Sequence, residues 1–252
     1  MRKAASLSLS REGGAEGGKT AVQLTVREVG RFLDVAESTV LRWVKQRGLP
    51  ARHVGGQYRF NRAELLEWAT ANRIKVSLEM FDDFETEDEP PLSLAEALEA
   101  GGVFHGLADT DKQRALRALV EVLPQVEGID RELLLRLFLA REASASTAIG
   151  DGIAIPHVRN PIVLHVARPM VTLCFLEKPV DFGALDGKPV YVLFSLVCPT
   201  TRTHLQMMAR LSYALHDAQF KDVVLRRGQR SEILSEARRV DAALAAPRKA
   251  VP

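Results

Sequence analysis

Two long, continuously apolar stretches, Pro169–Glu177 and Val190–Cys198, constrain the fold of this chain more than any other feature. A strand with one face in water alternates apolar and polar residues. These two stretches are hardly interrupted by polar residues, so both of their faces must be covered. Amphipathic patterns predict the covering helices at 111–123, at 130–143 and from Thr200 onward. We therefore expect an α/β domain in which helices cover a mixed sheet.

The stretch from Ile149 to His157 is predicted to place a histidine at the end of a short buried strand. The Gly-Asp-Gly sequence at 150–152 is typical of a tight reversal, because glycine adopts backbone angles that other residues resist. Residues 153–155 then predict a strand, and Pro156 ends it because proline cannot donate to a sheet ladder. An imidazole held at such a strand end is well placed for chemistry.

Charge divides the chain into three segments. Through Val76 there are 14 Lys and Arg against 7 Asp and Glu, and residues 77–99 hold 9 acidic residues and no basic one. A basic head, an acidic connector and a nearly neutral body indicate modules with separate partners. The predicted division is a disordered leader at 1–21, a small N-terminal domain at 22–75, an acidic linker at 76–91, a body domain at 92–244 and a disordered tail at 245–252.

Cysteine use and hydropathy predict a cytoplasmic protein without membrane insertion. Cys174 and Cys198 lie in apolar runs and form no Cys-x-x-Cys pair, so we expect buried thiols. The first basic residues are followed by Ser, Gly and Glu rather than by the apolar core of a signal peptide. The longest apolar run is too short to cross a bilayer.

The N-terminal domain has the pattern of a winged helix-turn-helix. Thr25 and Glu28 form a capping box that opens a first helix, and a second helix is predicted over 38–47. Gly-Gly at 55–56 predicts a two-residue hairpin, and Asn61 is predicted to cap a third helix.

Residues 24–73 resemble the excisionase and MerR-type DNA-binding modules, through Ser-Thr-Val-Leu-Arg-Trp at 38–43, Gly-Leu-Pro at 48–50 and the wing at 54–60. The polar arc of the second helix offers hydrogen-bonding groups and two cations to a major groove, and the wing arginines suit phosphate or minor-groove contact. The alternative is a helical module whose basic face contacts proteins. We expect double-stranded DNA to be contacted by Ser38, Thr39, Arg42, Lys45, Arg52, Tyr58 and Arg59.

Residues 92–240 resemble the IIA domains of the phosphoenolpyruvate-dependent phosphotransferase system, of the mannitol/fructose and nitrogen-regulatory type. The signature of that family is an acidic or amide residue, a spacer, an apolar-Gly pair and Ile-Ala-Ile-Pro-His. Here six residues separate Glu142 from Ile149-Gly150, and Ile-Ala-Ile-Pro-His follows and ends on His157. The sequence departs from the family at Val158, where a small residue is usual.

This resemblance implies a phosphoryl-transfer site formed by three residues. His157 would be the phosphorylated nucleophile, Arg141 would clamp the phosphoryl oxygens, and His204 would hydrogen-bond them. A separate physical argument adds that the first turn of the helix carrying His204 presents free N–H groups and a positive dipole end to an anion. No cofactor and no metal are implied beyond the covalent phosphoryl group on His157. The implied partners are a phosphorylated histidine phosphocarrier protein as donor, and a IIB domain or another regulatory protein.

The whole chain is thus predicted to be a DNA-binding transcriptional regulator with a phosphorylatable IIA-type body, a phosphocarrier rather than a free-standing metabolic enzyme. Two alternatives stay open: a phosphocarrier in sugar uptake whose head only docks, and a degenerate IIA domain that acts by protein binding, which the Val158 departure allows. Because one small reading head binds DNA weakly, a homodimer is also expected.

Simpler roles exist for each predicted site residue. His157 could be a satisfied core histidine, Arg141 a cation at a helix C-terminus, and His204 a surface histidine. A zinc site would need a His-Glu-x-x-His motif or a cysteine pair beside the four body histidines from 157 onward, and a serine hydrolase would need Gly-x-Ser-x-Gly. The sequence contains none of these motifs.

Overall fold

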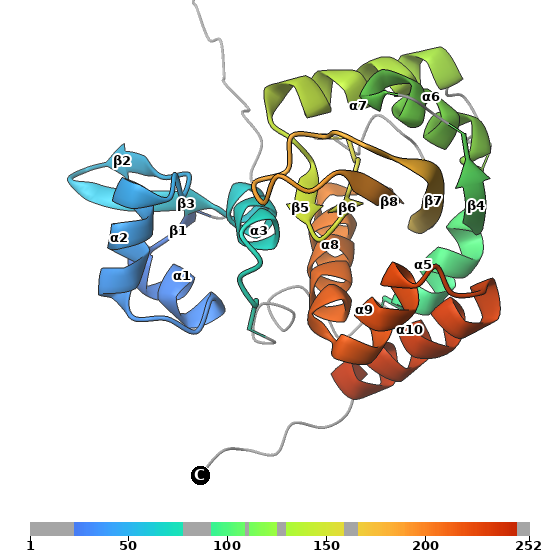
Figure 1. Cartoon of the computed structure of the whole chain (residues 1–252). Coiled ribbons are helices and arrows are strands. Elements are labelled where there is room, and N and C mark those ends of the chain that lie inside the picture. The colour runs from blue at the N-terminus through green and yellow to red at the C-terminus, as the bar shows by residue number, and fades with distance from the viewer. Residues whose placement is uncertain (1–22, 78–91, 109–110, 125–129, 159–165, 246–252) are drawn as a thin grey trace, which may run out of the picture.

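A small N-terminal unit and a larger α/β body make up the computed structural model (Figure 1). The structure describes residues 23–77, 92–108, 111–124, 130–158 and 166–245. The predicted leader, most of the predicted acidic linker and most of the predicted tail lie outside the described residues. No helix in the described part of the chain is long and apolar enough to cross a membrane.

The N-terminal unit follows the predicted order of helix, helix, hairpin and helix, with one short strand added. Its elements are β1 (Gln23–Leu24), α1 (Val26–Phe32), α2 (Glu37–Gln46), β2 (Arg52–Val54), β3 (Gln57–Asn61) and α3 (Arg62–Ala71). The capping box is confirmed, since the Thr25 hydroxyl accepts from the Glu28 N–H and the Glu28 carboxylate accepts from the Thr25 N–H at 2.7 Å. The unpredicted β1 pairs with β3, which gives the sheet order β1-β3-β2.

The body contains a five-stranded mixed sheet, as the sequence predicts. Its strands are β4 (Val103–Leu107), β5 (Ala148–Gly150), β6 (Ile153–Ala154), β7 (Met170–Val180) and β8 (Val190–Val197), in the spatial order β4-β7-β8-β6-β5. β7 and β8 pair antiparallel, whereas β4 with β7 and β6 with β8 pair parallel. The helices are α5 (Leu94–Gly101), α6 (Lys112–Val122), α7 (Arg131–Ser144), α8 (Thr201–His216), α9 (Ala218–Leu225) and α10 (Arg230–Ala245).

Helices cover both faces of this sheet, and that explains the continuously apolar strands. α6 and α7 lie over one face, and α5, α9 and α10 lie on the other side (Figure 1). Consecutive residues of β7 and β8 alternate between two apolar cores. Leu173 and Phe194 pack in the core that includes α5, α8, α9 and α10, whereas Cys174 and Leu193 pack in the core that includes α6 and α7.

Strand β4, at one edge of the sheet, has no counterpart among the predicted strands. His105 and Gly106 in it are exposed, so the segment lacks the apolar run or clean alternation that marks a strand. β4 forms because it pairs with β7, a long-range contact that the local pattern does not contain.

Helix α3 joins the N-terminal unit to the body. The Asn61 side chain caps it, as predicted, by accepting from the N–H groups of Ala63 and Glu64. Six of its ten residues are buried, because α3 packs on its own hairpin on one side and on β5 and α8 of the body on the other. In Figure 1, α3 lies between the rest of the N-terminal unit and the body.

Candidate functional site

His157 is held at one end of the sheet with a defined tautomer. It follows β6, forms a bridge to Leu196 of β8, and is 2% exposed. Its ring atom Nδ1 lies 2.7 Å from the carbonyl oxygen of Ile155. Because a carbonyl can only accept, Nδ1 carries a proton, and because the Nε–H of Arg141 points at Nε2, the lone pair of the ring lies on Nε2.

Arg141 turns its guanidinium toward this lone pair. It lies in the last turn of α7, is 6% exposed, and its Nε donates to Nε2 of His157 at 3.3 Å. Nη1 donates to the carbonyl of Ala145 at 2.8 Å, which orients the guanidinium plane. We call the space beside Nε2 of His157, faced by Arg141, the Nε2 site.

Glu142, the acidic residue of the motif, makes its own contacts on the connection that follows α7. Its carboxylate accepts from the N–H of Thr147 at 3.0 Å and from the hydroxyl of Thr147 at 2.6 Å, and it pairs with Lys112 at 3.2 Å. These bonds tie the end of α7 to the start of β5. Glu142 therefore helps to position its neighbour Arg141 rather than facing the Nε2 site.

His204 is the second histidine that the structure brings to this place. The ring centroids of His157 and His204 lie 5.1 Å apart, and His204 is 5% exposed in the first turn of α8. Its Nδ1 has no hydrogen-bond partner among the described residues. Burial, and then the neighbouring His157, lowers the pKa of His204 to about 3, so the ring stays neutral.

The N-terminus of α8 is capped by its own residue Thr200. Thr200 caps the helix, its hydroxyl accepting from the N–H of Thr203 at 3.0 Å and its carbonyl from the N–H of His204 at 3.0 Å. The amides of Thr203 and His204 are therefore bonded within the helix, and the expectation that free N–H groups of this turn face an anion stays a prediction for the amides before them. This turn also contributes the side chain of His204, whose ring lies beside that of His157.

The buried neutral His204 predicts a specific loss of stability in acid. An unfolded histidine takes up a proton near pH 6.5 and folded His204 does so near 3, so stability is lost as the pH falls between these values. The slope reaches about 1.4 kcal/mol per pH unit for one proton. We expect urea unfolding between pH 6 and 4 to show this slope, and His204→Gln to flatten it by about one proton. Parallel profiles for the two proteins would contradict the burial argument.

A third group at the Nε2 site comes from the N-terminal unit and was not predicted. Glu67 of α3 places Oε2 2.7 Å from Nη2 of Arg141 and Oε1 3.3 Å from Nε2 of His157. Its side chain is 24% exposed. No spacing within the body signals this residue, since it lies 74 and 90 positions before its two partners.

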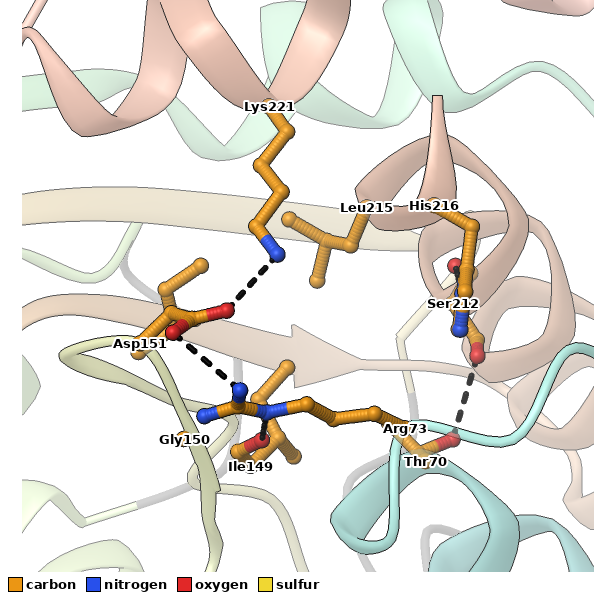
Figure 2. Close-up of a pocket in the computed structure, with 10 residues that line it drawn as sticks. Thr70, Arg73, Ile149, Gly150, Asp151, Ser212, Leu215, His216 and Lys221 are labelled. Atoms are coloured by element: carbon orange, nitrogen blue, oxygen red, sulfur yellow. Dashed lines mark hydrogen bonds and ion pairs between the residues drawn. The ribbon is translucent and has the colours of Figure 1, made fainter. Parts of the chain in front are cut away.

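The Gly-Asp-Gly reversal before the histidine is confirmed, because Gly150, Asp151 and Gly152 all have positive φ, at 87°, 52° and 76°. Its aspartate pairs with Lys221 at 2.8 Å, with Lys188 at 3.0 Å, and with Arg73 of the N-terminal unit at 3.2 Å. Hydrogen bonding to Lys221 is the largest cause that lowers the pKa of Asp151 to about 2. Figure 2 shows Asp151 between Lys221 and Arg73.

The predicted DNA-contacting residues lie on α2 and the hairpin, on the side of the unit away from the body (Figure 1). Ser38, Arg42, Lys45 and Arg52 are exposed, and Thr39, Tyr58 and Arg59 are half-buried. Two of the cations have partners within the unit: Arg59 donates to the Gln57 side chain at 2.8 Å, and Arg52 lies 4.0 Å from Glu64.

Val158, the departure from the family pattern, points into the protein. It is 1% exposed and packs in the core that includes α6 and α7. Its side chain therefore does not form part of the surface around His157.

Comparison with known proteins separates the same two parts of the chain. The family described as phosphoenolpyruvate-dependent sugar phosphotransferase system, EIIA 2, matches residues 96–237, and the family described as helix-turn-helix domain matches residues 24–73.

The curated relatives include nitrogen regulatory proteins. That of Klebsiella oxytoca is 35% identical over 108 residues, which cover 42% of this chain and 65% of the relative, so the match spans a little under two thirds of that protein. That of Pseudomonas aeruginosa is 31% identical over 134 residues, which cover 52% of this chain and 85% of the relative. The crystal structure of nitrogen regulatory protein IIA-Ntr from Neisseria meningitidis has the same fold, with a TM-score of 0.50, 24% identity and coverage of 57% of this chain and 98% of that one.

Proposed function

The chain belongs to the EIIA 2 family of the phosphoenolpyruvate-dependent sugar phosphotransferase system, whose model covers more than half of it, and from this we propose that Nε2 of His157 accepts a phosphoryl group. One observation carries the proposal: the Ile155 carbonyl holds the proton on Nδ1 at 2.7 Å and so leaves the nucleophilic lone pair on Nε2, beside Arg141.

The transfer balances without moving a proton. The P–N bond of a phosphohistidine donor breaks and its electron pair returns to the donor ring, while the lone pair of His157 Nε2 forms the new N–P bond. The Nδ1–H group of His157 keeps its hydrogen bond to the Ile155 carbonyl throughout. Arg141 offers a guanidinium to the charge on the phosphoryl oxygens, and neutral His204 offers a ring nitrogen that has no other partner in the described structure.

We propose a regulatory role for the whole chain, with a phosphorylated histidine phosphocarrier protein as donor and double-stranded DNA as the target of the head. The N-terminal unit matches a helix-turn-helix family, and its α2 side chains Arg42 and Lys45 stay exposed while α3 lies on the body. Docking through α3 alone does not require an exposed basic face on α2. The presence of this face therefore favours a DNA-binding regulator over a sugar-uptake component.

The phosphoryl half is tested by incubating the full chain with phosphoenolpyruvate, the two general phosphotransferase proteins and a radiolabel. We expect one acid-labile phosphoryl group per chain, located by mass spectrometry on the peptide that contains His157. Absence of label, or label on another residue, would show the proposal to be wrong.

The DNA half predicts salt-dependent binding that relies on Arg42. Each phosphate contact contributes about −0.9 to the slope of log K against log salt, so Arg42→Ala should weaken a mobility shift and lower the magnitude of the slope by about 1. Arg136→Ala on α7 removes the same charge from an exposed position of the body and is the matched control. Equal losses in both variants would point to nonspecific charge rather than to α2.

A further inference from the structure

The Nε2 site is occupied by a carboxylate from the other unit of the same chain. Glu67 uses one oxygen for Arg141, at 2.7 Å, and the other for Nε2 of His157, at 3.3 Å. These are the two contacts that a phosphoryl group on Nε2 would take: a bond from the ring nitrogen and a guanidinium partner for its oxygens.

We propose that Glu67 acts as an internal stand-in for the phosphoryl group, so that docking of α3 on the body and phosphorylation of His157 exclude one another. This inference rests on the proposed function. It adds how the site is regulated: the head of an unphosphorylated chain closes the site, and the donor must displace the head to reach it.

The first reason for exclusion is access. With α3 in place, His157 is 2% exposed and Arg141 is 6% exposed. Transfer between two histidines needs the donor ring and the acceptor ring in line across one phosphorus. A donor protein cannot bring its phosphohistidine to a nitrogen that another side chain covers.

The second reason is the chemistry at Nε2. Arg141 Nε donates to the lone pair of Nε2, and a carboxylate oxygen of Glu67 lies 3.3 Å from the same nitrogen. The carboxylate therefore lies beside the nitrogen that would attack phosphorus. After transfer, the phosphoryl charge lies against the Glu67 carboxylate, and like charges in a buried site repel.

The third reason is that several contacts between the units are polar. Besides those of Glu67, they include a bond of 3.3 Å between the hydroxyls of Thr70 and Ser212, and the contacts of Arg73 with Asp151, Asp186 and the Ile149 carbonyl. A cavity of about 140 Å³ lies between these contacts, lined by residues of both units (Figure 2). If α3 leaves, Asp151 keeps Lys188 and Lys221, so this carboxylate remains paired.

The first test measures the initial rate of phosphorylation of the full chain by the phosphorylated phosphocarrier protein. Glu67→Gln keeps the shape of the side chain and removes its charge, so we expect a rise of at least about fivefold. Glu64→Gln is the matched control, because Glu64 lies on the same helix and faces Arg52 within the head, and its rate should equal that of the wild type.

The second test locks the head. Because the Thr70 and Ser212 hydroxyls lie 3.3 Å apart, Thr70→Cys with Ser212→Cys should form a disulfide under oxidation. We expect the oxidised protein to take up phosphate at least about tenfold more slowly than the reduced protein. Prior phosphorylation should slow the formation of this disulfide.

The outcomes separate the two proposals. If the wild type is labelled on His157 but Glu67→Gln and the locked protein are labelled at the wild-type rate, the exclusion of docking and phosphorylation is wrong and the phosphoryl acceptor stands. If no form of the chain is labelled, reduced or oxidised, the phosphoryl acceptor itself is wrong, and the exclusion falls with it.

Discussion

Replacing Arg141 by Ala is expected to slow phosphorylation of His157 by about 100- to 1,000-fold, the usual cost of losing one preorganised group that faces developing charge in an active site. Arg141 reaches Nε2 of His157 from a buried position, with its plane held by the Ala145 carbonyl at 2.8 Å. A guanidinium already in place needs no reorganisation when the phosphoryl oxygens arrive. The measurement is the initial rate of label transfer from the phosphocarrier protein.

Two controls make this result specific. Arg141→Lys keeps the charge but loses the forked geometry, so its rate should fall between those of the wild type and Arg141→Ala. Arg136→Ala, an exposed arginine on the same helix, should transfer at the wild-type rate. A rate for Arg141→Ala within a few-fold of the wild type would show that Arg141 only supports the end of α7.

Because Arg141 also pairs with Glu67 at 2.7 Å, its replacement removes one of the contacts that dock α3. This weaker docking opposes the loss of rate and could mask part of it. The double variant Arg141→Ala with Glu67→Gln removes the opposing effect, and we expect it to remain at least about 100-fold slower than Glu67→Gln alone.

Replacing Gly101 by Ala is expected to destabilise the protein by about 3 kcal/mol, the upper part of the usual range for an overpacked interior. Helix propensity alone predicts the opposite, since Ala in a helix is favoured over Gly by about 1 kcal/mol. A Cβ on Gly101 would lie 2.3 Å from the carbonyl oxygen of Val171 and 2.4 Å from its carbon, because the end of α5 lies directly on β7. Those are backbone atoms of a central strand, so they cannot move aside.

Urea unfolding of the purified full chain measures this loss. Gly106→Ala is the matched control: a Cβ there meets nothing within 4 Å, and its φ of 73° limits the cost to backbone strain of about 1–2 kcal/mol. If Gly101→Ala were as stable as the wild type, α5 and β7 would not be packed as closely as the structure has them.

Local sequence patterns were enough for much of the fold. The capping box at Thr25 and the cap at Asn61 predicted helix starts because those side chains bond to N–H groups within three residues. The Gly-Asp-Gly turn and the apolar β7 and β8 were predicted because backbone angle and burial on both faces restrict residue type directly. β4 was missed because an exposed His-Gly pair in an edge strand carries neither restriction.

The candidate site divides in the same way. His157, Arg141 and His204 could be named in advance from a family motif, and the structure brings them together at the end of the sheet. The tautomer of His157 could not be named, because it depends on where the Ile155 carbonyl points after the proline turn. The role of Glu142 in holding the end of α7 was equally hidden, since it depends on Thr147 and Lys112 meeting there.

The primary structure alone was sufficient to predict two modules, a covered mixed sheet and a histidine at a strand end, since each follows from residue type and short-range spacing. Only the tertiary structure decided that the modules are in contact and that Glu67 of the head meets Arg141 and His157 of the body. These contacts join Glu67 to residues that lie 74 and 90 positions later in the chain, and they depend on the packing of α3 on β5 and α8. Packing between folded surfaces depends on their combined shape and charge, which no periodicity along the chain reports.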